Sequence, residues 1–176
     1  MDIVLPDYQA AIDDALQLVY SQHHRLISQL HPESFRELTL EELREGPLGR
    51  DLRRLAALAR GELREPKDLG LSAIDSVLQI LFWPAAADDY TVPRSFWDTE
   101  LGRMLALAKY RAYDPTELVS IGSAAQQLGV TRPTIYRWMD DRTLNYVRDD
   151  MSGRTFVVRR DIDNLKRVAA ELSAEG

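Results

Sequence analysis

The chain has 176 residues, of which 45% are hydrophobic, and it contains three histidines and no cysteine. A chain of this length can bury enough apolar surface to fold as one domain or two small ones without disulfides or a structural metal. The lack of cysteine excludes a disulfide framework, a thiolate zinc site and a cysteine nucleophile. We find no signal peptide and no apolar run of membrane-spanning length, and therefore expect a cytoplasmic protein with no membrane partner.

The net charge of −6 is unevenly distributed along the chain. Residues 1–119 carry 13 Lys or Arg and 20 Asp or Glu, whereas residues 120–168 carry 9 Lys or Arg and 6 Asp or Glu. The overall acidity argues against a protein that coats nucleic acid regardless of sequence. The basic balance of the last third instead favours a DNA-reading module attached to an acidic interaction domain.

Apolar residues at a heptad-like spacing predict a helix between Asp7 and Leu30. This stripe consists of Ile12, Leu16, Val19, His23, Leu26 and Leu30. Because the stripe is short, it is either the core-facing side of an ordinary amphipathic helix or a dimerisation face. We take these six residues as the candidate dimerisation surface and expect a homodimer.

Three further helices are predicted before residue 114. The first begins near Pro47 and ends at Gly61, the second begins at Ser72 and the third begins at Ser95. The Asp114-Pro115 dipeptide then interrupts the helical pattern. We therefore expect an acidic helical domain over residues 1–114, for oligomerisation or partner binding, and a second domain over residues 115–176.

Two of these predicted helices contain similar short sequences. Leu48-Gly49-Arg50 resembles Leu101-Gly102-Arg103, which is too short a match to establish a repeat. A glycine in a helical pattern indicates a close approach of two helices or a helix start, unless the match arises by chance.

Residues 120–140 predict two short helices joined by a tight turn. Ser123 with Gln126 forms a capping box for the first helix, and Gly129 supplies a left-handed stop. Thr131 then caps a second helix, and Pro133 is tolerated in its first turn. This arrangement is a helix-turn-helix.

The second helix of this motif has two chemically distinct sides. Its apolar side consists of Val130, Ile135, Trp138 and Met139, and its polar side of Thr131, Arg132, Thr134, Tyr136 and Arg137. Arginine can form a bidentate contact with guanine, and hydroxyl groups reach phosphates. The polar side is thus either a solvated helix face or a surface that reads DNA.

Two β-prone runs follow, at residues 145–148 and 155–158, separated by a turn-rich loop that contains Ser152-Gly153. A last helix then places Ile162 and Leu165 on its apolar side. The order predicts a mainly α protein, with a helical N-terminal domain followed by a winged helix-turn-helix that has a small two-stranded β-hairpin.

Residues 119–168 resemble the MerR/excisionase-like winged helix-turn-helix, on the sequence from Ser120 to Trp138, the wing ending in Gly153-Arg154 and the start of the last helix. The resemblance implies double-stranded DNA as the partner. It implies that the five polar residues named above face the major groove, and that Arg148 and Arg154 approach phosphate or the minor groove. Acidic residues at 140–141 and 149–150 depart from the basic pattern of the family. In MerR proteins the DNA-binding domain also comes first, whereas here it comes last.

The motifs of common enzyme classes do not occur in this sequence. It contains no phosphate-binding glycine loop, no GxSxG elbow and no HExxH motif. The three histidines, His23, His24 and His31, are not spaced for a shared metal site. We expect neither an enzyme nor a bound metal or cofactor.

The sequence therefore predicts a protein that binds double-stranded DNA sequence-specifically, as a bacterial-type transcriptional regulator and as a homodimer. Two alternatives remain. One is an antitoxin-like or adaptor protein whose N-terminal domain binds a protein partner. The other is an excisionase-type architectural factor for recombination, which would bind tandem sites and bend DNA.

Overall fold

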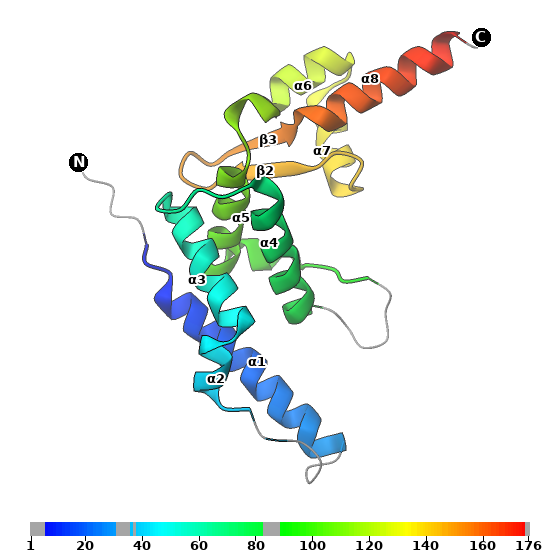
Figure 1. Ribbon diagram of the computed structural model, residues 1–176. Helices are drawn as coiled ribbons and strands as arrows, with labels where there is room; N and C mark the ends of the chain where they lie inside the picture. Colours follow the sequence, from blue (N-terminus) through cyan, green and yellow to red (C-terminus); the bar gives the residue numbers. More distant parts are fainter. Residues whose placement is uncertain (1–5, 31–35, 37, 83–88, 175–176) are drawn as a thin grey trace.

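The computed structural model describes residues 6–30, 36, 38–82 and 89–174, and it confirms a mainly α fold (Figure 1). The N-terminal part contains α1 (Gln9–Leu30), α2 (Leu40–Glu45), α3 (Pro47–Arg60), α4 (Lys67–Phe82), the 3-10 helix η2 (Arg94–Asp98) and α5 (Glu100–Ala112). The C-terminal part contains the 3-10 turn η3 (Pro115–Glu117), β1 (Leu118–Ser120), α6 (Ile121–Leu128), α7 (Arg132–Asp140), β2 (Tyr146–Asp149), β3 (Arg154–Val158) and α8 (Arg159–Ala174). None of the described helices is long and apolar enough to cross a membrane.

The N-terminal part is a helical bundle in which α3 packs against α5, with α1 and α4 beside them (Figure 1). Its fully buried side chains include Leu16, Leu52, Leu55, Met104, Leu105 and Leu107. Gly61 ends α3 as predicted, because its φ of 75° places it in the left-handed region that glycine tolerates.

Two helix starts differ from the sequence prediction. α4 begins at Lys67 rather than Ser72. Asp68 lies in its first turn, where a negative charge interacts favourably with the positive end of the helix dipole. α5 begins at Glu100, because Thr99 rather than Ser95 is its N-cap and accepts the Gly102 amide at 3.0 Å.

The two similar glycine sequences mark equivalent helix starts. Gly49 lies in the first turn of α3 and Gly102 in the first turn of α5, each directly after a shorter helix. A Cβ atom at Gly49 would lie 1.9 Å from the carbonyl oxygen of Arg44, and one at Gly102 would lie 2.0 Å from that of Phe96. Only glycine permits the chain to pass this close to itself at these two turns.

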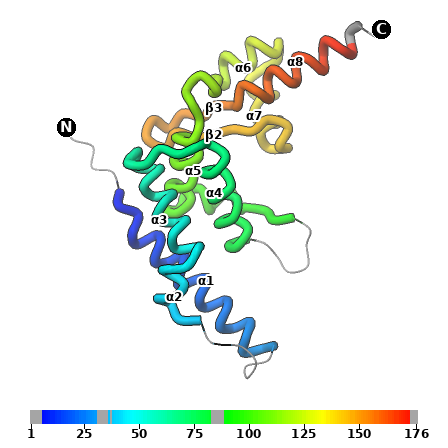
Figure 2. Tube along the Cα trace, in the orientation of Figure 1, coloured from blue at the N-terminus to red at the C-terminus, as the bar shows by residue number. Residues whose placement is uncertain are grey.

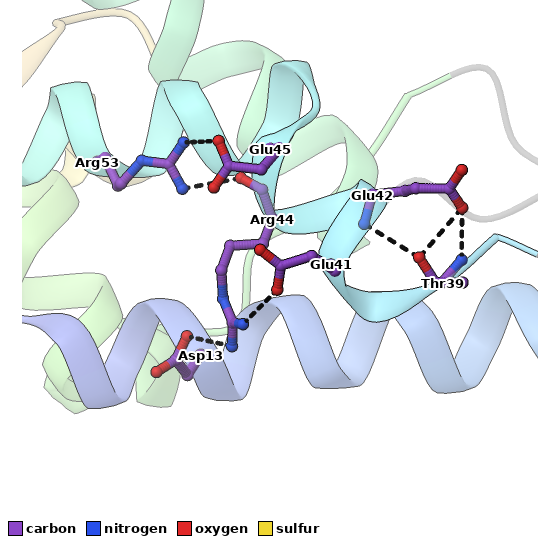
Figure 3. A network of polar contacts seen from close by, with 7 residues as sticks. All are labelled: Asp13, Thr39, Glu41, Glu42, Arg44, Glu45 and Arg53. Carbon is purple, nitrogen blue, oxygen red and sulfur yellow. Dashed lines mark hydrogen bonds and ion pairs between the residues drawn. The ribbon is translucent and has the colours of Figure 1, made fainter.

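Polar contacts fix α2 against α1 and α3 (Figure 3). The Arg44 guanidinium of α2 lies between Asp13 of α1, at 3.2 Å, and Glu41, at 3.0 Å. Arg53 of α3 contacts Glu45 at 3.5 Å and donates to the Arg44 carbonyl at 2.8 Å. These contacts are partly exposed, so they orient the short helix more than they stabilise the bundle.

The residues of the predicted dimerisation stripe on α1 differ in how far they are buried. Ile12 and Leu16 are 2% and 0% exposed because they belong to the core of their own chain, so their assignment to a dimer interface is wrong. Val19 is half-buried against the same core, whereas Leu26 and Leu30 are 57% and 64% exposed. His23, between these groups, is half-buried.

The C-terminal part places three helices around a small antiparallel sheet. The strand order is β1-β3-β2, so the predicted hairpin of β2 and β3 is present and a third strand, which the sequence did not predict, adds to it. The missed strand, β1, comprises only Leu118–Ser120 and pairs with β3. A segment this short has no alternation of its own for the sequence to reveal. Ala124, Ile135, Leu144, Val157 and Ile162 form the centre of this core.

The C-terminal part rests on the N-terminal bundle through the side of its hairpin. β2 runs alongside α5, while α8 lies above the sheet and extends away from the bundle (Figure 2). The buried apolar residues form two main clusters, one before Asp114 and one after it.

Candidate nucleic-acid interface

The helix-turn-helix consists of α6, a turn at Gly129 and α7. Gly129 has a φ of 66°, the left-handed conformation expected for this stop, and the following amide, of Val130, donates back to the last turn of α6 at 3.0 Å. Ile135 and Met139 of α7 are buried, and Trp138 packs partly against the same core. The apolar side of α7 is therefore the one that the sequence predicted.

The N-cap of α6 differs from the prediction. Ser120 rather than Ser123 caps this helix, because its hydroxyl accepts the Ser123 amide at 3.2 Å. The helix thus begins three residues earlier, directly after β1, and no residue of loop separates the strand from the helix-turn-helix.

The polar side of α7 points away from the core. Thr131, Arg132 and Arg137 are exposed, and Tyr136 is 50% exposed. Thr134 is half-buried, and its hydroxyl lies 3.0 Å from that of Thr131. The N-cap residue Thr131 makes no side-chain capping bond. The structure brings all five predicted residues to α7 and its N-cap, with Thr134 the least accessible.

The side chain of Arg132 at the start of α7 reaches toward α6. Its guanidinium lies over the first turn of α6, since a Cβ added at Gly122 would be 3.0 Å from one of its terminal nitrogens. This position brings the cation close to the start of a helix, where phosphate groups bind well.

The other end of α7 is in contact with the N-terminal bundle. Asp140 lies 2.6 Å from the Arg94 guanidinium of η2, and Arg142 lies 3.3 Å from Asp89. Hydrogen bonds from Thr143 hold the pKa of the neighbouring Asp141 below its ordinary value. Asp140 thus has a cation of the bundle beside it.

The tip of the β2–β3 hairpin, residues 150–153, also faces the bundle. The Asp150 carboxylate lies 3.8 Å from Nε of Arg103 in α5 and 4.0 Å from Nε of Arg148 in β2. Burial and the nearby Asp150 raise the pKa of the Tyr8 phenol at the start of α1. The hairpin tip is thus held near α1 and α5 and does not project freely into solvent.

The two arginines predicted for the wing lie on opposite faces of the hairpin. Along β3, Val157 faces the helix-turn-helix core, whereas Phe156 stacks on an aromatic ring of α5. Arg154 shares the face of Phe156 because side chains alternate along a strand. Arg148 pairs with Thr155, which shares the face of Val157. Only Arg148 therefore lies on the same face of the sheet as α7.

Arg94 and Arg103 were missed by the sequence analysis. Both are exposed arginines of the N-terminal part, and nothing in their local sequence distinguishes them from other surface arginines. Their proximity to the C-terminal part depends on how the two parts pack, which no short motif encodes.

Among the described residues, no three histidine or carboxylate side chains are grouped so as to hold a metal ion. His24 stacks on Tyr20 with ring centroids 6.3 Å apart. His31 lies outside the described residues.

Comparison of the chain with protein-family models, with curated proteins and with solved structures found no match.

Proposed function

We propose that this protein binds double-stranded DNA sequence-specifically through α7, and that it acts as a bacterial-type transcriptional regulator without enzymatic activity. The observation that carries the proposal is the exposed side of α7, with Tyr136 and Arg137 on a helix whose opposite side anchors it to α6. A helix presented in this way fits the major groove of B-form DNA. The resemblance to MerR/excisionase-like domains supports the same assignment.

We assign each of the predicted residues a role from its position. Arg137 and Tyr136, in the middle of α7, read base edges, and Thr131 and Thr134 contact the backbone or bases at its start. Arg132, over the first turn of α6, binds a phosphate rather than a base. Arg148 supplies a further phosphate contact, whereas Arg154, on the α5 side of the hairpin, is the weakest candidate.

The proposed regulator is a homodimer located in the cytoplasm. A single helix-turn-helix makes few base contacts, and a second copy gives the specificity that a regulator needs. The surface for this contact is the exposed part of the α1 stripe, Leu26 and Leu30. Ile12 and Leu16, at the start of the stripe, are buried in the core of their own chain.

The test is selection of duplexes from a randomised DNA pool by the full-length chain, followed by sequencing. We expect one recurrent motif, which Arg137→Ala binds about 10-fold to 100-fold more weakly and with relaxed preference at particular base pairs. Arg148→Ala should weaken binding to every duplex and reduce the slope of log affinity against log salt by about 1. Arg25→Ala, an exposed arginine of α1, is the control. If no motif is enriched, the proposal is wrong.

A further inference from the structure

Two acidic side chains of the C-terminal part each contact an arginine of the N-terminal bundle. Asp140 is the last residue of α7, and its carboxylate lies 2.6 Å from Arg94 of η2. Asp150 is at the tip of the hairpin, and its carboxylate lies 3.8 Å from Arg103 of α5. In both pairs the acid belongs to the C-terminal part and the cation to the N-terminal part.

Uncompensated carboxylates at these positions would oppose binding of a polyanion. A unit charge about 7 Å from a phosphate in water changes affinity by roughly a factor of three, less at high salt because of screening. Asp140 continues the helix that carries Arg137, so it approaches the phosphates that flank any groove into which α7 inserts.

We infer that Arg94 and Arg103 complete the DNA-binding surface by neutralising Asp140 and Asp150. The inference rests on the DNA-binding role proposed above. It makes the N-terminal bundle a part of the binding surface and not only a support for dimerisation.

The contacts around Asp150 show what Arg103 adds. One carboxylate, 25% exposed, lies between two guanidinium groups, those of Arg103 and Arg148. The three side chains together carry one net positive charge. Without Arg103, Asp150 cancels the charge of Arg148, and the wing loses its cation on the α7 side.

A third contact between the two parts has the opposite polarity. Arg142, directly after α7, lies 3.3 Å from Asp89 of the loop that precedes η2. In this pair Asp89 neutralises the positive charge of Arg142, and the contact joins the loop to the end of α7. The loop leads into η2, which begins with Arg94.

The experiment uses the full-length chain and the duplex that the wild-type protein selects from the randomised pool. We expect Arg94→Gln and Arg103→Gln each to lower affinity about threefold, and the double variant to lower it about tenfold, near 0.1 M salt. Arg36→Gln is the matched control, because Arg36 is also an exposed arginine paired with an acid, Glu42 of α2. It should bind like the wild type.

A charge-removal pair separates neutralisation from direct contact with DNA. Asp140→Asn should tighten binding about threefold, and adding it to Arg94→Gln should restore affinity close to the wild-type value. Failure of Asp140→Asn to restore binding would overturn the inference, since Arg94 would then contact phosphate itself. Wild-type affinity in both arginine variants would also overturn it.

Thermal unfolding of each variant verifies the fold, and Asp140→Asn alone still tests the inference if Arg94→Gln does not fold. If the wild-type chain selects no duplex, the proposed function fails instead.

Discussion

The Lys109 amine of α5 lies 5.9 Å from the centre of the Tyr146 ring of β2, at the contact between the N-terminal bundle and the hairpin. Burial lowers the pKa of Lys109 below its ordinary value of 10.5, and the nearby Asp161 of α8 only partly offsets this effect. A cation is thus held between the two parts at a cost in solvation.

This arrangement predicts how stability depends on pH. Between the lowered pKa of Lys109 and 10.5, the unfolded chain binds more protons than the folded chain, so the free energy of unfolding rises with pH in that window. Lys109→Met removes the partly buried charge and should raise the free energy of unfolding at pH 7 by about 1 kcal/mol, measured by urea denaturation. The difference from the wild type should shrink as the pH approaches 10.5.

Lys67→Met is the control with the opposite sign. Lys67 of α4 pairs with Glu117 of η3, and hydrogen bonding to Glu117 raises the pKa of Lys67. This pair contributes stability below 10.5 that is lost as the pH rises through the raised pKa. The variant should therefore be less stable at pH 7, by less than about 1 kcal/mol because the pair is partly exposed. Equal effects of both substitutions would contradict the assignment.

The starts of α3 and α5 should not tolerate a methyl group. Gly49→Ala and Gly102→Ala each place a Cβ about 2 Å from a backbone carbonyl oxygen, which a side-chain movement does not relieve. We expect each to lower the free energy of unfolding by more than about 2 kcal/mol. Gly129→Ala is the comparison, since its Cβ would meet no atom within 4 Å and only the positive φ opposes it, at about 1 kcal/mol. Equal losses at all three positions would mean that the close approach does not matter.

Elements whose signals are local are predictable from the sequence. The stop at Gly129 and the two sides of α7 follow from residues within one or two helical turns, and the structure agrees with them. The start of α5 was placed wrongly because Ser95 and Thr99 carry equivalent capping chemistry, and only the fold selects Thr99.

Features that depend on packing between distant segments were not predictable in this way. Ile12 and Leu26 look alike in the heptad pattern, yet one is in the core and the other is exposed, because the bundle covers only the first half of α1. The contacts of Arg94 and Arg103 with the C-terminal part have the same origin.

The contact between the two parts makes a further prediction, at Tyr110 of α5. Its ring stacks on Phe156 of β3, with centroids 5.8 Å apart and an angle of 25° between the ring planes. Tyr110→Ala should lower the free energy of unfolding by about 2 kcal/mol, since both the apolar contact and the ring stacking are lost. Tyr136→Ala, on the exposed side of α7, should change it by less than about 0.5 kcal/mol. Thermal unfolding checks both, and an unchanged melting temperature for Tyr110→Ala would show that the stack does not stabilise the protein.

The last prediction concerns the proposed dimer. The final turns of α1 lie at the edge of the bundle (Figures 1 and 2), and Leu26 and Leu30 on these turns are exposed. Burying them against a second copy removes apolar surface from water, at roughly 25 cal/mol per Å². Leu26→Glu combined with Leu30→Glu should therefore give a monomer with unchanged helix content, measured by light scattering and circular dichroism at micromolar concentration. Leu16→Glu should instead unfold the bundle, because Leu16 is fully buried.

A dimer also requires paired half-sites about 34 Å apart, or a multiple of this, in the selected DNA, so the monomeric variant should bind one half-site without cooperativity. A wild-type chain that is monomeric at these concentrations, or a double variant that remains dimeric, would rule out this end of α1 as the interface.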